Sequence, residues 1–352
     1  MAINTFTGAT NNNWGTATNW SQGTVPTAVD GHTTTFDNTS PNCTVDTSAR
    51  VCQILTFNGG TGYTNTITMT NTITVSGNIT LGASMVIAGI AALILGANST
   101  FTSNGKTWSN GLSYGSFTLT LGDNVTVSGT LQGFNGSALG VITGAFTLHC
   151  QGDVNIAGQT TSGTALVLID GTGTQNIAIE TSRGYNGDLT INKPSGTLTV
   201  SSNLTGRGGH TWTIAANQTI TWGTFVIADN SGILILDCNG NTIYGLNVAG
   251  LTVQLASSLI ISGSFSVGTG GLISSTVSST SRKLTVLSSA TVTLLTVLSI
   301  TDIDSSSGQR IYIISGTLTR TANWAVLNIP KYYTFHRSRR NKISHFNQQI
   351  GL

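Results

Sequence analysis

Charged residues are scarce in this 352-residue chain: they make up 7% of it, and Glu180 is its only glutamate. The exposed side of a surface helix is normally built from glutamate, lysine, arginine and alanine, so this composition argues against helices. Strands have no such need, and threonine, serine and asparagine can fill their polar positions. We therefore expect an all-β protein.

Long apolar runs and a secretion signal are missing as well. The most apolar stretch, 85–95 (MVIAGIAALIL), is shorter than the roughly 20 residues that cross a bilayer, so we predict buried strands there and no membrane span. The first residues, MAINTFTGATNNNW, lack the basic start and apolar stretch of a signal peptide. We expect the protein to stay in a cytoplasm until it is assembled or released. Hydrophobic residues still make up 39% of the chain, enough for a folded core.

Cysteine is also rare, and its spacing indicates no metal site. Cys43, Cys52, Cys150 and Cys238 form no CxxC pair, so we predict free, buried thiols. The five histidines are dispersed, and His149 has only the adjacent Cys150, whose side chain would point to the opposite face of a strand. We predict no metal and no cofactor.

What the chain does contain is a recurring local pattern from about residue 50 to 325. A few alternating apolar and Thr or Ser positions are followed by a Gly or Asn turn, as in SFTLTLGDNVTVSGTL at 116–131. There the apolar residues fall on one face by strict period two: Phe117, Leu119, Leu121, Val125 and Val127. The pattern predicts short strands joined by tight turns.

The recurrence of these units leaves a sandwich, a propeller and a solenoid open, and three features favour the solenoid. Many positions between strands are Gly or Ser, and runs such as 232–243 are apolar on successive residues. An Asn near a turn, followed two residues later by Thr or Ser, would suit stacked turns bonded by amide side chains, and it recurs at Asn78, Asn98, Asn124, Asn203 and Asn217. We predict a single-stranded parallel β-helix with about 20 to 25 residues per coil.

Three segments follow from this interpretation. Residues 1–48 are aromatic-rich and form a cap or docking segment, with Trp14 and Trp20 as its candidate docking residues. Residues 49–328 form the β-helix body, and 329–352 form a basic C-terminal arm. Such a rod needs capped ends, because open terminal strands invite edge-to-edge association.

Two stretches carry a resemblance to known proteins. NWSQGTVPTAVDGHTTTFDN at 19–38 resembles the leading motif of β-solenoid proteins on bacterial surfaces and in phage particles, and 171–205 resembles their repeats. The resemblance implies a β-helical fold and a surface setting, such as a tail spike, a fibre or a capsid decoration protein, and it brings no catalytic residues. The missing secretion signal departs from bacterial adhesins. It favours a phage virion over the alternative, a bacterial cell surface.

The rival function is enzymatic, because phage β-helices often cleave polysaccharides. A glycoside hydrolase or lyase commonly needs paired carboxylates, and the single close pair here is Asp302 and Asp304. On a strand these two side chains would share a face. The structural alternative is a polar strand end that runs into a Ser/Gly turn, which we favour, so we predict no catalytic residues.

Charge is distributed unevenly along the chain. Residues 1–304 carry seven basic and twelve acidic groups, net −5, whereas 305–352 carry seven basic groups and no acid, net +7. The C-terminal cluster comprises Lys331, Arg337, Arg339, Arg340 and Lys342. Such an arm can bind nucleic acid, dock on an acidic protein surface or remain solvated. We favour docking and expect no nucleic-acid partner.

Together these features predict a non-enzymatic structural virion protein of a tailed phage that serves particle assembly and host-surface attachment. The expected partners are further copies of the chain in a homotrimer, other virion proteins and host surface glycans. The Trp14/Trp20 segment or the basic arm would anchor it to the particle.

Overall fold

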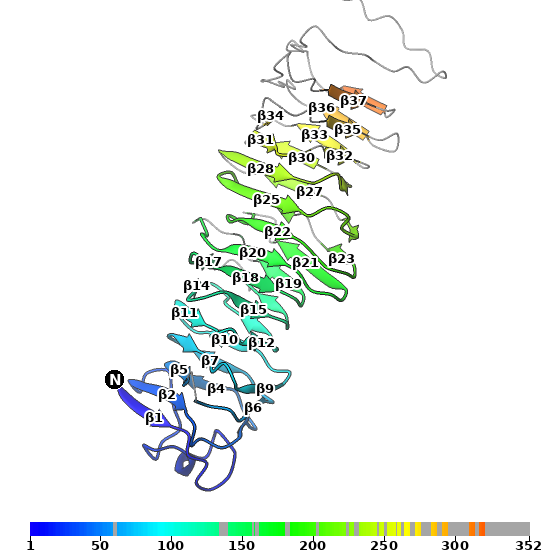
Figure 1. The fold of residues 1–352 in the computed structure, drawn as a ribbon. Coiled ribbons are helices and arrows are strands. Elements are labelled where there is room, and N and C mark those ends of the chain that lie inside the picture. Colours follow the sequence, from blue (N-terminus) through cyan, green and yellow to red (C-terminus); the bar gives the residue numbers. More distant parts are fainter. Residues whose placement is uncertain are drawn as a thin grey trace, which may run out of the picture.

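The computed structural model is a long stack of short parallel strands that rises in chain order from the N-terminal end (Figure 1). The structure describes residues 1–257, except 59–61, 134–139, 157, 159–161, 180–183, 202–203, 223–224, 229–231, 245 and 250–251. Beyond residue 257 it describes only the seven strands from β32 to β38, whose bounds follow below. Among the described residues the sole helix is a 3₁₀ turn, Ala17–Asn19, and no helix could cross a membrane.

Six sheets make up the described stack, and the three with the most strands are called its first, second and third faces. The first face is a seven-stranded sheet of β1 (Ala2–Thr5), β2 (His32–Phe36), β5 (Ile54–Phe57), β8 (Ile79–Thr80), β11 (Ser99–Thr102), β14 (Thr118–Leu121) and β17 (Val141–Thr143). The second is a nine-stranded sheet of β4 (Arg50–Cys52), β7 (Ile73–Val75), β10 (Leu93–Leu95), β13 (Leu112–Ser113), β16 (Leu131–Gln132), β19 (Val154–Ile156), β21 (Gln175–Ile179), β23 (Leu198–Val200) and β26 (Ile220–Thr221).

The third face is a nine-stranded sheet of β12 (Thr107–Trp108), β15 (Val125–Val127), β18 (Thr147–Cys150), β20 (Leu166–Ile169), β22 (Leu189–Ile191), β25 (His210–Ile214), β28 (Ile233–Asp237), β31 (Thr252–Leu255) and β34 (Leu272–Ser275). Three smaller sheets complete the stack. The three-stranded sheet contains β3 (Cys43–Val45), β6 (Thr66–Met69) and β9 (Val86–Gly89). The six-stranded sheet contains β24 (Leu204–Thr205), β27 (Phe225–Ala228), β30 (Leu246–Ala249), β33 (Ser264–Val267), β36 (Thr291–Leu294) and β38 (Thr317–Arg320). The four-stranded sheet contains β29 (Thr242–Ile243), β32 (Leu259–Ile261), β35 (Lys283–Val286) and β37 (Arg310–Ile313).

Successive strands of the chain lie in different sheets, which defines a single-stranded parallel β-helix. β10, β11 and β12 belong to the second, first and third faces, and β13 returns to pair in parallel with β10. Leu112 pairs with Leu131 and Leu131 with Val154, so one coil takes 19 residues and the next takes 23. The predicted fold class is confirmed.

The core follows the period-two pattern of the sequence. Leu119, Leu121, Val125 and Val127 are buried, and Phe117 packs partly buried against them. The four cysteines are likewise buried free thiols, and burial raises the pKa of each of them. The buried apolar residues form one continuous cluster along the described stack.

The apolar run at 85–95 is only partly buried, which corrects the expectation of buried strands throughout. Met85, Leu93 and Leu95 face the core, but 47% of Val86 and 94% of Ile90 are exposed. β9 is the last strand of its small sheet, and its final residue, Gly89, leads into a turn with φ +87°. That turn separates β9 from β10, so the run cannot keep every side chain inside.

The asparagine spacing has the predicted role at three turns. The Oδ1 atoms of Asn78, Asn98 and Asn124 each accept a hydrogen bond from a backbone N–H of the next coil, at Thr100 (3.0 Å), Thr118 (2.8 Å) and Thr147 (3.0 Å). Asn203 lies outside the described residues. The prediction is wrong for Asn217, which adopts φ +60°, and its neighbour Gln218 makes the bond between coils.

Candidate functional site

An aromatic cluster closes the N-terminal end of the core. Phe6, Trp14 and Phe36 are fully buried and Trp20 is 2% exposed. The ring centroids of Trp14 and Trp20 lie 5.0 Å apart in an edge-to-face arrangement, as favoured by the quadrupoles of aromatic rings. Phe36 stacks on Phe57 of the next coil at 4.8 Å, which joins the cluster to the body.

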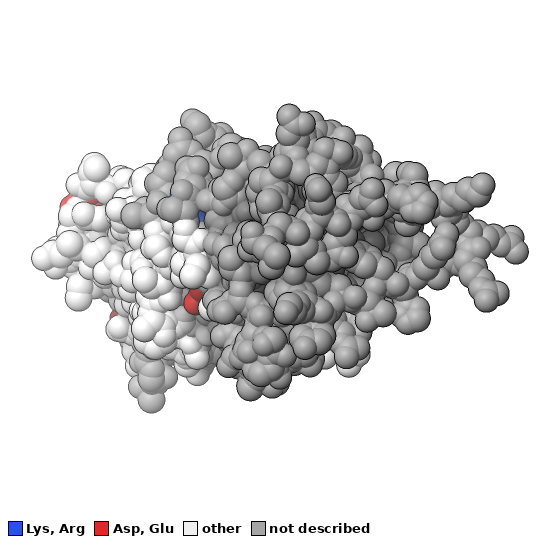
Figure 2. All heavy atoms as spheres, turned by 90° about the horizontal axis from the view of Figure 1, so that it is seen from above, with Lys and Arg blue, Asp and Glu red and all other residues white. Residues whose placement is uncertain are grey.

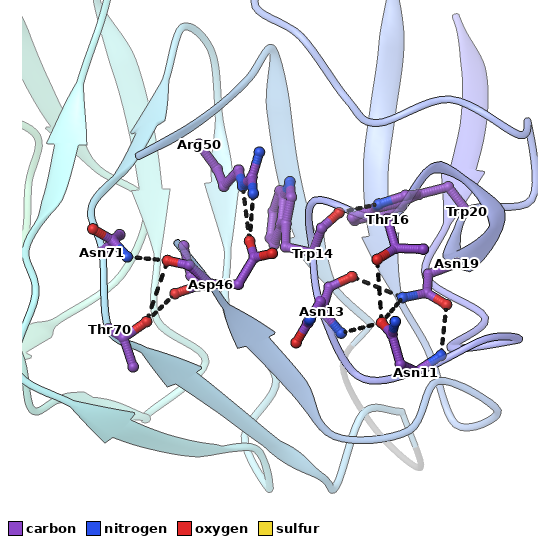
Figure 3. A network of polar contacts seen from close by, with 11 residues as sticks. Asn11, Asn13, Trp14, Thr16, Asn19, Trp20, Asp46, Arg50, Thr70 and Asn71 are labelled. Carbon is purple, nitrogen blue, oxygen red and sulfur yellow. Dashed lines mark hydrogen bonds and ion pairs between the residues drawn. The ribbon is translucent and has the colours of Figure 1, made fainter. Parts of the chain in front are cut away.

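Polar side chains hold the loop that carries this cluster (Figure 3). Asn11 Oδ1 accepts hydrogen bonds from Asn13 N (2.9 Å), Thr16 Oγ1 (3.2 Å) and Asn19 Nδ2 (2.8 Å). Trp20 Nε1 donates to the Trp14 carbonyl at 2.7 Å. These bonds fix the loop so that it places both indole rings over the core, although Trp14 Nε1 is buried without a hydrogen-bond partner among the described residues.

The open edge of β1 is covered by the segment that follows Trp20. Ser21 Oγ accepts from the Thr5 amide (2.9 Å), the Ser21 amide donates to the Thr5 carbonyl (2.9 Å), and Gln22 Nε2 donates to the Ile3 carbonyl (3.0 Å). An uncovered parallel edge would pair with another chain. This end of the solenoid is therefore capped in both its core and its backbone.

An ion pair joins the cap to the first coils (Figure 3). Arg50 Nε lies 3.2 Å from Asp46 Oδ1, and its Nη2 bonds to the same oxygen. The guanidinium also packs against Gly15, where an added Cβ would collide with it unless the arginine side chain shifted. The backbone carbonyl of Asp46 accepts from the side chains of Thr70 and Asn71 in the next coil.

Of the predicted docking residues, the structure describes the two tryptophans but not the basic arm. Trp14 and Trp20 are core residues of the cap, so any docking by segment 1–48 would use its exposed side chains. The basic residues Lys331, Arg337, Arg339, Arg340 and Lys342 lie outside the described residues, as do Asp302 and Asp304. Their predicted roles stay predictions.

Two histidine–aspartate pairs on the third face escaped the sequence analysis. His149 Nδ1 lies 2.7 Å from Asp170 Oδ2, and His210 Nδ1 lies 3.3 Å from Asp188 Oδ1. In both pairs the partners are one coil apart, 21 and 22 residues along the chain. Cys150 points into the core, away from His149, as the alternation of a strand predicts.

Ser162, His210 and Asp188 are arranged in the order of a catalytic Ser-His-Asp triad, but the contacts of His210 suit a structural role better. His210 Nε2 lies 3.1 Å from Ser162 Oγ and also 2.8 Å from Asn186 Oδ1. A base that activates serine needs a free lone pair on this nitrogen, whereas an amide oxygen at 2.8 Å calls for an N–H there. The imidazole thus ties together three consecutive coils.

Two further polar residues, Gln175 and Lys193, are buried at the corner between the third and second faces and bond to neighbouring coils. Gln175 is 1% exposed, and its Nε2 donates to the carbonyls of Cys150 (3.0 Å) and Gly152 (2.6 Å) in the preceding coil. Lys193, 7% exposed, follows in the next coil, and its amide donates to Gln218 Oε1 (2.7 Å) one coil further on. Side chains here replace the backbone pairing that the strands supply elsewhere.

No site for a bound metal emerges from the described part of the chain, where no three His, Cys, Asp or Glu side chains are grouped closely enough to hold an ion. Comparison with known proteins yields no match of the chain to a family model, a curated protein or a solved structure.

Proposed function

We propose that this protein is a structural rod of a tailed phage particle, a β-helical spike, fibre or capsid decoration protein that serves assembly and attachment to the host surface. The observation that carries the proposal is the capped parallel solenoid itself. Its coils are joined by continuous backbone pairing, by asparagine side chains at the turns and by a closed N-terminal end. Such a stack suits a part that must resist proteases and shear.

The outer surface supports attachment by weak repeated contacts. On the first face, partly exposed threonines stack in register from coil to coil, Thr56 on Thr80 and Thr80 on Thr102. The strands of this face contain no Lys, Arg, Asp or Glu. Figure 2, which views the stack from above, shows few acidic or basic residues among the described residues in view. Neutral hydroxyl rows of this kind suit multivalent contact with surface glycans.

The particle setting draws support from the sequence. Residues 19–38 and 171–205 resemble phage and bacterial surface solenoids, and the basic arm contrasts with residues 1–304, whose net charge is −5. A positive arm can dock on an acidic neighbouring subunit. We place the arm at the base of a homotrimer, in contact with another virion protein.

Incorporation into particles tests the arm. Deleting residues 331–352 should abolish incorporation of the protein into purified particles, as measured by immunoblotting of banded virions. A full-length control with Lys331, Arg337, Arg339, Arg340 and Lys342 all changed to glutamine separates charge from chain length. If both variants enter particles at the parental level, the arm is not the anchor.

Sugar release distinguishes this proposal from the enzymatic alternative. The structural proposal predicts no reducing sugar from host capsule incubated with the purified protein. If the parent protein releases sugar and the variants Asp302→Ala and Asp304→Ala do not, the protein is a depolymerase and the structural proposal is wrong.

A further inference from the structure

The buried corner holds an amine against a carboxamide. Lys193 Nζ donates hydrogen bonds to the carbonyls of Gly171 (2.6 Å) and Gly173 (2.9 Å) and to Gln175 Oε1. Lys193 is 7% exposed and Gln175 is 1% exposed, so water has little access to either group. The two residues lie in consecutive coils, 18 positions apart. A bond between them would therefore join two coils.

The carboxamide of Gln175 is fixed in one orientation. Its Oε1 accepts from the Gly171 amide at 3.0 Å, and its Nε2 donates to the carbonyls of Cys150 and Gly152. The Gly171 N–H polarises the carbonyl and would stabilise negative charge that develops on Oε1. The Gln175 amide nitrogen faces away from that donor, toward the preceding coil.

The carboxylate of Asp170 acts electrostatically on Lys193. Asp170 directly precedes Gly171, and its Oδ2 bonds to His149 Nδ1. Its Oδ1 is buried and has no hydrogen-bond partner among the described residues. Burial lowers the pKa of the Lys193 ammonium, and the charge of Asp170 acts in the opposite direction. Burial, the larger of the two effects, thus favours loss of a proton from Lys193.

We infer that Lys193 and Gln175 form an intramolecular isopeptide bond, with Asp170 as the group that carries the proton. After the ammonium has lost one proton, Nζ attacks Cδ of Gln175, and the carbonyl electron pair moves onto Oε1, held by the Gly171 N–H. Asp170 takes a proton from Nζ and delivers it to Nε2. The Cδ–Nε2 bond breaks, ammonia leaves, and an Nζ–Cδ amide remains. No oxidant or cofactor is needed.

The bond would suit a rod that bears load. Hydrogen bonds between coils break singly under force, whereas an amide between consecutive coils holds this corner covalently. Lys106, the other lysine among the described side chains, lies at a surface turn and is a matched control. Its amide bonds to the Ser103 carbonyl of its own turn.

Intact mass spectrometry of the purified full-length chain tests the inference. The parent should be lighter than its sequence by the mass of one ammonia, and a protease digest should contain one cross-linked peptide with both Lys193 and Gln175. Lys106→Met should keep the loss, and Lys193→Met should abolish it. Asp170→Asn should retain the full mass or lose ammonia far more slowly, with the parental circular dichroism spectrum.

Two results would overturn the inference. One is a parent that keeps its full mass while folded, even after prolonged incubation, because Lys193 is then only a hydrogen-bonding residue. The other is loss of ammonia that persists in Lys193→Met, because the loss then arises elsewhere. If Lys193→Met fails to fold, the cross-linked peptide in digests of the parent decides.

Discussion

Alkaline pH should destabilise this protein through its buried thiols, and Cys52 isolates the effect. Burial raises the pKa of Cys52 from 9.0 to about 12, and the charge of Asp30 acts in the same direction. The unfolded chain loses the thiol proton above about pH 9, whereas the folded chain keeps it up to about pH 12. The folded state therefore binds more protons in this window, and its stability falls as the pH rises.

The magnitude follows from the two pKa values. At about pH 10 an unfolded thiol is ionised roughly ten to one and the buried thiol hardly at all, so each such cysteine lowers the free energy of unfolding by about 1.4 kcal/mol. Cys238, with a pKa of about 12, and Cys43 and Cys150, with raised pKa values, should act in the same direction. Four thiols give about 6 kcal/mol, comparable with the whole stability of many domains.

Urea denaturation under reducing conditions, followed by tryptophan fluorescence, measures this. Between about pH 7.5 and pH 10 the loss of stability should be smaller by about 1.4 kcal/mol in Cys52→Ala than in the parent. Val75→Ala is the control, because Val75 pairs with Cys52 in register and is equally buried but does not titrate. The lowered pKa of Lys193 acts in the opposite direction and stabilises the folded state as the pH rises. Because the parent and both variants keep Lys193, this effect cancels in the comparison. An equal loss in parent and Cys52→Ala would refute the reasoning.

Three other changes address the cap and the turns. Trp20→Ala should cost about 3 to 5 kcal/mol and expose the N-terminal segment to limited proteolysis, since it removes a ring from a closed cluster. Asn124→Ala should cost about 0.5 to 1.5 kcal/mol and speed hydrogen exchange at the Thr147 amide, which loses its acceptor. The double change Ser21→Ala and Gln22→Ala should remove the side-chain bonds to the edge of β1 and promote association, seen as increased light scattering; an unchanged monodisperse sample would show that the edge needs no side-chain cover.

Much of the fold could be predicted because a solenoid repeats one local rule. The alternation in 116–131 identifies its core residues without knowledge of any distant contact. Asn78, Asn98 and Asn124 likewise lie at turns where a backbone N–H of the following coil needs an acceptor. Composition argues against α-helices, since one glutamate cannot supply their exposed faces.

The polar sites could not be predicted, because they depend on which coil positions meet. His149 with Asp170, and Lys193 with Gln175, are 21 and 18 residues apart, and coil length varies too much for a fixed period to pair them. A search for His, Asp, Lys and Gln at separations near one coil would have found both as candidates. Val86 and Ile90 were misplaced because local hydrophobicity does not reveal where a small sheet ends.

Immunogold electron microscopy of purified phage particles, with an antibody raised against this chain, tests the central claim most directly. The account predicts gold on projecting rods at a fixed place on every particle. Particles without label, beside a bacterial envelope that is labelled, would contradict it.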